Sequence, residues 1–394
     1  MRFISAILLS VTATIAQPGY SQDLQSQTPP AHTISVSQLA QEPEHLEKNL
    51  AERGVSFQGL FIHDWSEELA SSDSPAGFGR DALDLSLTLD AKKALGWKGT
   101  SGMLRLKQHI SEFGETYPYA SQVVSNIDGP SKTTLYELWI QQILFSEKLR
   151  VKFGKIDANT EFDQVQSAGD FLNSSMGYSP TILAFPSYPE PKLAAAAFYV
   201  PRQNYQLGLG IFKTATNGVL SVAEPGRVWT LPKGDLPGHV SVGYWRLDGS
   251  MNSFEGSHVS HTQGVYSVLE QSLWRQPLNG DGNERRLTTF FQFGHADGFI
   301  CDFTAHLGTG AVLQAPFTSR PHDGIGVALT SVQFSSHNPG MPKRQIESVF
   351  ESYYKLTVNS HVSLVQDFQL VHRPGGLKSN QDCPILTPRV VIAF

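Results

Sequence analysis

Long apolar runs, basic clusters and cysteines are scarce in this sequence of 394 residues. Beyond residue 22, no stretch reaches the ~18 consecutive apolar residues that a membrane-spanning helix needs. Lysine and arginine number 30 against 36 aspartates and glutamates, and without a basic patch we expect no nucleic-acid partner. The sequence has two cysteines, and neither they nor the histidines show metal-ligand spacing, so we expect no metal and no cofactor.

The N-terminus has the features of an export signal. Met1 and Arg2 precede a short, mostly apolar run from Phe3 to Ile15, and small residues follow it. This pattern predicts a secretory signal peptide over residues 1–22, the alternative being a buried N-terminal helix. Residues 23–53 are expected to form a polar linker and a short helix. An exported chain without a membrane helix is either soluble or a β-barrel.

From Gly54 onward, short runs of alternating apolar and polar residues recur between turn-forming clusters. In the run from Leu83 to Asp90, leucine occupies every odd position and Asp, Ser or Thr every even one. Residues 103–107 and 148–153 repeat this alternation with lysine and arginine as the polar partners. Because successive side chains of a strand point to opposite faces, each run has one apolar and one polar face. Several such strands favour a transmembrane antiparallel β-barrel over residues 54–394, with a wet lumen.

The spacing of these runs predicts sixteen strands, an even number as bacterial barrels require. With both ends of the barrel in the periplasm, the outer connections are longer on average than the inner ones, although connections 296–300 and 308–322 depart from this rule. The long connection 158–193 is expected to fold into the lumen. The predicted strands cover residues 54–64, 81–91, 100–110, 134–145, 148–157, 194–200, 204–213, 222–231, 239–247, 263–275, 286–295, 301–307, 323–334, 346–356, 361–372 and 387–394.

Several motifs, in their order along the chain, resemble the carbohydrate-selective porin family of the outer membrane. The resemblance implies a sixteen-stranded sugar channel in the outer membrane of a Gram-negative bacterium that passes glucose and related sugars, with outer-membrane lipids around it. The motifs are Leu50–Phe57, Leu95–Gly99, Phe153–Asn159 followed by Glu161-Phe162, Phe171–Ser175, Arg320–Gly326, Glu347–Tyr354, and Asp367–Val371 with Pro374–Gly376; the last strand ends on Phe394.

A sugar channel needs a constriction whose charges and donors replace part of the hydration of the solute. Acidic side chains on an inward loop that face basic side chains on the wall would create an electric field across the pore. Trp139 shares a strand face with Glu137 and Gln141 and is a candidate to stack on a pyranose, or else an interface tryptophan. The candidate pore-lining residues are Arg105, Lys107, Glu137, Trp139, Arg150 and Lys152 on the wall and Asp157, Asn159, Glu161 and Asp163 on the loop.

Export places Cys301 and Cys383 in an oxidising compartment. Cys301 begins a predicted strand at its outer end and Cys383 lies in the last outer loop, on the same side of the membrane, so a disulfide between them is one candidate. Several functions remain open at this level. An outer-membrane enzyme would need a serine activated by a histidine, for which Ser336 and His337 are candidates, but an enzyme is the weaker hypothesis. A general diffusion porin and a secreted β-rich sugar-binding protein also fit the sequence, which is compatible with both a monomer and a homo-oligomer.

Overall fold

The computed structural model describes residues 49–69, 77–111, 120–278, 284–339 and 344–394. The predicted signal peptide and linker lie outside these residues; of the predicted short helix, residues 49–52 are described and are helical. In this part of the chain, no helix is both long and apolar enough to cross a membrane.

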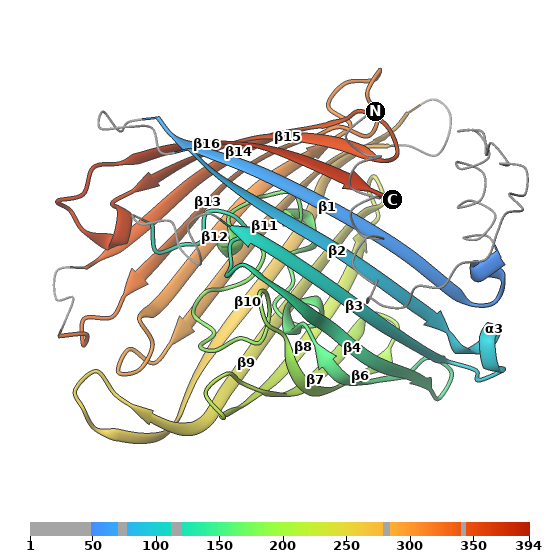
Figure 1. The fold of residues 1–394 in the computed structure, drawn as a ribbon, viewed down its shortest axis with the longest axis horizontal. Helices are drawn as coiled ribbons and strands as arrows, with labels where there is room; N and C mark the ends of the chain where they lie inside the picture. The colour runs from blue at the N-terminus through green and yellow to red at the C-terminus, as the bar shows by residue number, and fades with distance from the viewer. Residues whose placement is uncertain (1–48, 70–76, 112–119, 279–283, 340–343) are drawn as a thin grey trace, which may run out of the picture. The chain divides into compact units, whose positions relative to one another are not determined.

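Within the described residues, sixteen antiparallel strands form a closed barrel, which confirms the predicted fold class (Figure 1). Each strand pairs with its neighbours in sequence, and β1 pairs with β16. The strands are β1 Val55–Glu68, β2 Phe78–Asp90, β3 Thr100–Ser111, β4 Lys132–Leu144, β5 Leu149–Ile156, β6 Lys192–Arg202, β7 Tyr205–Lys213, β8 Val219–Leu231, β9 Leu236–Asn252, β10 His258–Pro277, β11 Glu284–Ala296, β12 Phe303–Gln314, β13 Gly324–Phe334, β14 Ile346–Thr357, β15 Val362–His372 and β16 Cys383–Ala393; a short helix α3, Ala91–Leu95, follows β2.

The strand predicted at 301–307 was too short, because β12 continues to Gln314. Gly308 and Gly310 weaken the strand signal in this segment, since glycine is depleted in strands. Pairing with β11 and β13 on both sides overrides that local preference. A Cβ atom at Gly310 would lie 2.5 Å from the Phe290 ring, so the glycine leaves room for this neighbouring aromatic side chain. The inner connection is therefore 315–323, shorter than the predicted 308–322.

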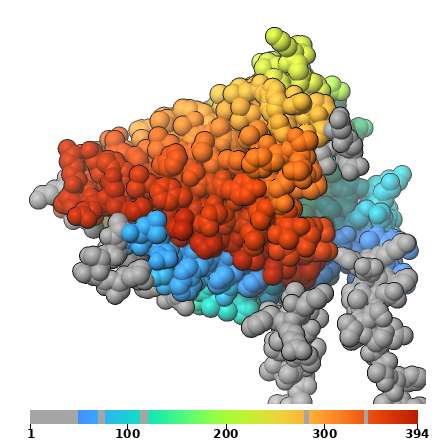
Figure 2. Space-filling model, turned by 90° about the horizontal axis from the view of Figure 1, so that it is seen from above, coloured from blue at the N-terminus to red at the C-terminus, as the bar shows by residue number. Residues whose placement is uncertain are grey.

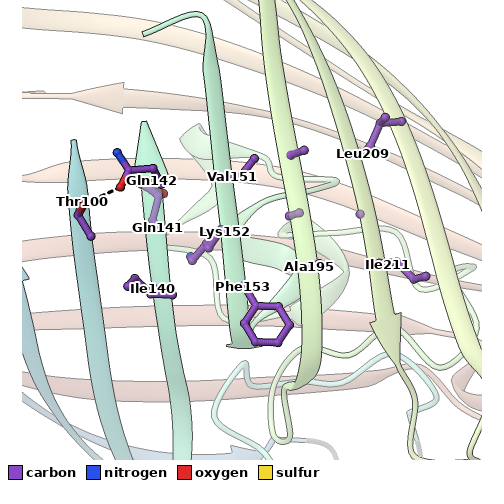
Figure 3. Close-up of a pocket in the computed structure, with 13 residues that line it drawn as sticks. Thr100, Ile140, Gln141, Gln142, Val151, Lys152, Phe153, Ala195, Leu209 and Ile211 are labelled. Atoms are coloured by element: carbon purple, nitrogen blue, oxygen red, sulfur yellow. Dashed lines mark hydrogen bonds between the residues drawn. The ribbon is translucent and has the colours of Figure 1, made fainter. Parts of the chain in front are cut away.

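The outer wall is apolar, as the alternation predicts. Ile140, Phe153, Ala195 and Ile211 are register partners across β4 to β7 and line one shallow pocket on this wall (Figure 3). Ile140, Phe153 and Ile211 are each more than half exposed. Exposed apolar rows of this kind are typical of the band that a barrel presents to the membrane.

The barrel closes where the first and last strands meet. β1 and β16 pair from Leu60 with Ala393 to Glu68 with Ile385, and Figure 2 shows the two ends of the barrel sequence side by side on the surface. Beyond the strand, the N–H and C=O groups of Phe394 bond to those of Gly59 at 2.9 and 2.6 Å. A Cβ atom at residue 59 would lie 2.2 Å from the Phe394 ring. The absence of a side chain at Gly59 therefore leaves room for the Phe394 ring.

Cys301 and Cys383 do not form a disulfide, so that expectation is wrong. Cys301 is buried just before β12 in one apolar cluster, and Cys383 is buried at the start of β16 in another. Four strand spacings of about 4.8 Å separate β12 from β16, whereas a disulfide needs Cα atoms within about 7 Å.

Candidate functional site

The segment between β5 and β6, residues 157–191, lies inside the barrel and is called the inner loop below. It contains three 3₁₀ turns, Ala158–Thr160, Gln166–Ala168 and Ser174–Met176. Its backbone bonds to side chains of strands far around the wall, including Glu270 of β10 and Glu351 of β14. The side chain of Gln292 on β11 also donates to the carbonyl of Met176.

Five glutamates on the inward face of the wall accept hydrogen bonds from backbone N–H groups of inward segments. Along the inner loop the contacts run in order around the barrel, from β4 through β8 and β10 to β14. Each of these carboxylates therefore holds a loop that has no strand pairing of its own. These wall glutamates are Glu137 (Asp157 N–H, 3.2 Å), Glu224 (Asp163 N–H, 2.9 Å), Glu270 (Ser167 N–H, 2.8 Å), Glu347 (Gln122 N–H, 2.7 Å) and Glu351 (Leu172 N–H, 2.5 Å).

A second segment also enters the lumen, which the sequence did not predict. Residues 120–131, after β3, are bound from the wall by Glu347 and by Arg389 of β16. The hydroxyl of Ser125 donates to Asp64 at 2.7 Å, and Arg389 donates to the same carboxylate at 2.6 Å. On the other side, Arg80 of β2 pairs with Asp128. Burial raises the pKa of Asp128 to about 6, against the effect of Arg80.

Apolar packing closes one side of the lumen. Phe162 of the inner loop stacks on Phe198 at 5.3 Å between ring centres and meets the Phe212 ring edge-on. Further along, Phe171 packs edge-on against Phe290 and Tyr353. These contacts press the loop against β6 to β14. The remaining opening therefore lies beside β1 to β4.

A cavity of about 610 Å³ occupies this opening and is called the eyelet below. Strands β1 to β4 form one side, and the two inward segments form the other. Its lining combines hydrogen-bonding groups with aromatic rings. The polar lining includes Asp84, Arg105, Lys107, Asn126, Asp128, Asp157, Asn159, Gln164, Gln166 and Asn173, and the aromatic lining is Tyr136, Phe171, Tyr178 and Tyr188.

The two cations of the eyelet have different amounts of unused hydrogen-bonding capacity. Arg105 donates to both oxygens of Asp84 at 2.5 to 2.9 Å and to Glu137 at 3.2 Å. Lys107 contacts Asp84 only at 3.3 Å and lies 4.2 Å above the Tyr136 ring. An ammonium has three donors. Lys107 therefore has donors to offer a solute, whereas Arg105 is held by its carboxylates.

A β-bulge places an unpredicted aromatic residue in the eyelet. Arg105 pairs with Glu137 and Leu106 with Leu135, so Tyr136 is the extra residue of β4. A bulge breaks strict alternation, and both Tyr136 and Glu137 are buried. The hydroxyl of Tyr136 donates to Asp157 at 2.5 Å. The sequence contains no turn or glycine signal that would have revealed this bulge.

Among the predicted pore residues, Arg105, Lys107, Asp157 and Asn159 meet at the eyelet. Glu137 lies directly behind them, bonded to Arg105. Asp84 was not predicted as a site residue, although it is on the polar face of the leucine-alternating run.

The remaining predicted residues meet elsewhere. Arg150 and Lys152 each contact Glu161 at 2.7 Å, so one carboxylate is shared by two cations in direct contact, and the charges do not face each other across an opening. Trp139 does not line the eyelet, and the Lys152 ammonium lies 3.9 Å over its ring. Asp163 is buried within the inner loop, where it accepts the Ser179 N–H at 2.6 Å.

Asp163 predicts a pH dependence of stability. Burial raises its pKa well above the usual range, and no cation is among the groups that act on it. The folded barrel therefore keeps this proton at pH values where the unfolded chain has lost it. Stability is then highest below the unfolded pKa of about 4 and falls as pH rises, by about 1.4 kcal/mol per unit until the folded pKa is reached. We expect Asp163→Asn to remove this dependence.

Urea unfolding at pH 5 and pH 8 measures this effect. The free energy of unfolding of Asp163→Asn, relative to that of the natural protein, should be higher at pH 8 than at pH 5. Asp235→Asn is the matched control, because Asp235 is 79% exposed at its side chain. An equal difference at both pH values would show that Asp163 is ionised in the folded barrel.

In the part of the chain that the structure describes, no hydrogen bond joins the Ser336 hydroxyl to the His337 ring. The ring instead contacts Glu255 at 3.1 Å and Phe299, and the hydroxyl of the neighbouring Ser335 donates to the carbonyl of Gly298. Among the described residues, no group of three metal-binding side chains is present.

A closed barrel with an apolar wall, a polar lumen and an inward loop defines a porin. The chain belongs to the carbohydrate-selective porin family, the OprB family, whose model matches residues 80–394. It is therefore an outer-membrane channel of a Gram-negative bacterium, and the predicted family is confirmed.

Individual relatives are distant in sequence. Porin B of Pseudomonas aeruginosa is 22% identical, over 83% of this chain and 85% of that one. A high-pH structure of Pseudomonas putida OprB is 19% identical with a TM-score of 0.81, covering 90% of this chain and 97% of that chain. Its low-pH structure, with the same identity and coverage, gives 0.60. These two structures show the similarity of the fold.

Proposed function

We propose that this porin passes neutral hexoses, glucose among them, and that the eyelet is its constriction. The observation that carries the proposal is the pairing of charges there. The cations Arg105 and Lys107 are matched by the carboxylates of Asp84 and Glu137, and Asp157 adds one acceptor. The eyelet therefore has no excess positive charge to select anions, but it keeps donors and acceptors for hydroxyl groups.

The aromatic lining supports the same class of solute. Tyr136, Tyr178 and Tyr188 place apolar ring surface beside polar groups. A hexose has hydroxyl groups around its rim and C–H groups on its faces, so it can use both kinds of surface. Residues 1–22 would direct the chain to export, and residues 54–394 would form the channel.

Conductance in a planar bilayer tests the proposal. Discrete current steps should appear, and glucose should reduce them in a saturable manner. Gluconate, which is anionic, should reduce them less at equal concentration. Steps that no sugar changes would instead indicate a general diffusion porin and contradict the proposal.

A further inference from the structure

A second polar cavity lies in the lumen beneath the inner loop, with a volume of about 700 Å³, and is called the exit cavity below. Arg286 near the start of β11 and Gln314 at the end of β12 place it toward the end opposite the outer connections. Gln166 lines both this cavity and the eyelet. The two cavities are therefore neighbours on either side of Gln166.

The exit cavity contains donors without partners. His239 Nδ1 and Arg286 Nε are buried and have no hydrogen-bond partner among the described residues, and the nearest carboxylate oxygen to His239 Nδ1 is that of Glu270 at 3.9 Å, beyond hydrogen-bond distance. Both line this cavity, with Ser272 and Gln314 beside them. A buried polar atom without a partner costs free energy unless a ligand or water satisfies it. These atoms therefore favour a ligand that carries acceptor oxygens.

The charges around the exit cavity favour a neutral ligand. Glu270 lines it with both oxygens engaged by the N–H groups of Gln166 and Ser167. Arg286 is paired with Glu284, so its charge is already balanced. The Glu270 carboxylate leaves the cavity with an excess of negative charge, which opposes an anion. A hydroxyl group can accept from Arg286, donate to Glu270, and either accept from or donate to His239 Nδ1.

We propose that the exit cavity is a second binding site for neutral carbohydrate, which receives sugar from the eyelet before release at the periplasmic end. This inference rests on the proposed sugar channel. It assigns Arg286 and His239 as ligand-binding residues of this site.

Side-specific block of single channels tests the second site. Glucose is added to one compartment at a time. The orientation of each channel is determined with Asn217→Cys, an exposed position in the outer turn between β7 and β8: a bulky thiol reagent that cannot cross the membrane changes the current only when it is added on the side that this turn faces. We expect Arg286→Gln to raise the half-saturating glucose concentration about tenfold for periplasmic addition, as loss of one charged donor predicts. For outer addition the change should stay within about twofold. Gln314→Ala should act in the same direction, more weakly.

Arg285→Gln is the matched control, because Arg285 is the adjacent residue on the other face of β11 and bonds to Ala315 and Thr318 instead. Retained heat-modifiable gel mobility shows that each variant is folded. If Arg286→Gln and Gln314→Ala both leave periplasmic block unchanged, the second site is overturned while the sugar channel stands. If the natural protein shows no saturable block from either side, the proposed function itself fails.

Discussion

Replacing Glu270 and Glu351 together by alanine is expected to enlarge the channel and weaken its block by sugar. Glu351 accepts the N–H groups of Leu172 and Asn173 at 2.5 and 3.2 Å, and Glu270 accepts the N–H groups of Gln166 and Ser167 at 3.1 and 2.8 Å. Each buried N–H left without an acceptor costs about 1–3 kcal/mol. The N–H groups of Leu172 and Asn173 are buried and those of Gln166 and Ser167 partly so, and we expect the loss of all four acceptors to release this part of the inner loop from the wall.

The measurable result is a higher single-channel conductance with more current noise, because the inner loop leaves the wall and samples several positions. Glucose should then reduce the current only at concentrations at least about tenfold higher, since the eyelet loses one of its sides. The double variant Glu270→Gln with Glu351→Gln is the matched control. A glutamine keeps one acceptor oxygen, which can still serve the Leu172 N–H at position 351 but only one of the two N–H groups at position 270. This variant should therefore raise the conductance clearly less than the double-alanine variant. Unchanged conductance in a folded double-alanine variant would mean that aromatic packing alone holds the loop.

Replacing Lys107 by glutamine is expected to have the largest effect on sugar affinity of any single change at the eyelet. Its ammonium contacts Asp84 only at 3.3 Å and has 12% of its side chain exposed. A hydrogen bond from a charged donor contributes about 1.5–3 kcal/mol. The half-saturating glucose concentration should therefore rise about tenfold or more. The folded barrel should remain, because Arg105 continues to pair with Asp84.

Lys155→Gln is the control for Lys107, since Lys155 lies on the outer face of β5 and donates to the carbonyl of Leu135. Glucose titration of the single-channel current measures both variants. Equal block in Lys107→Gln and the natural protein would assign sugar contact to the loop side of the eyelet. In that case Asn159 and Gln164 would be the next residues to replace.

The sequence by itself determined the barrel and the direction of most of its side chains. Alternation in the runs around Leu85, Leu106 and Val151 is sufficient to assign an inner and an outer face, because a strand has a period of two. It therefore placed Arg105, Lys107, Arg150 and Lys152 on the inward face, and the length of the connection 158–193 pointed to the inner loop. The outer-wall row from Ile140 to Ile211 follows from the same rule.

Only the tertiary structure decided which inward residues meet a solute. Arg150, Lys152 and Glu161 have the same residue types as the eyelet charges, but they pair with one another away from it. The bulge at Tyr136 breaks the alternation without a local signal, and residues 120–131 enter the lumen through contacts with Glu347 and Arg389, which are more than 200 positions away. Pairing across the lumen depends on which strands face each other in the closed barrel. Which strands face each other is fixed only when β1 pairs with β16 and closes the barrel, and no local sequence pattern encodes this pairing.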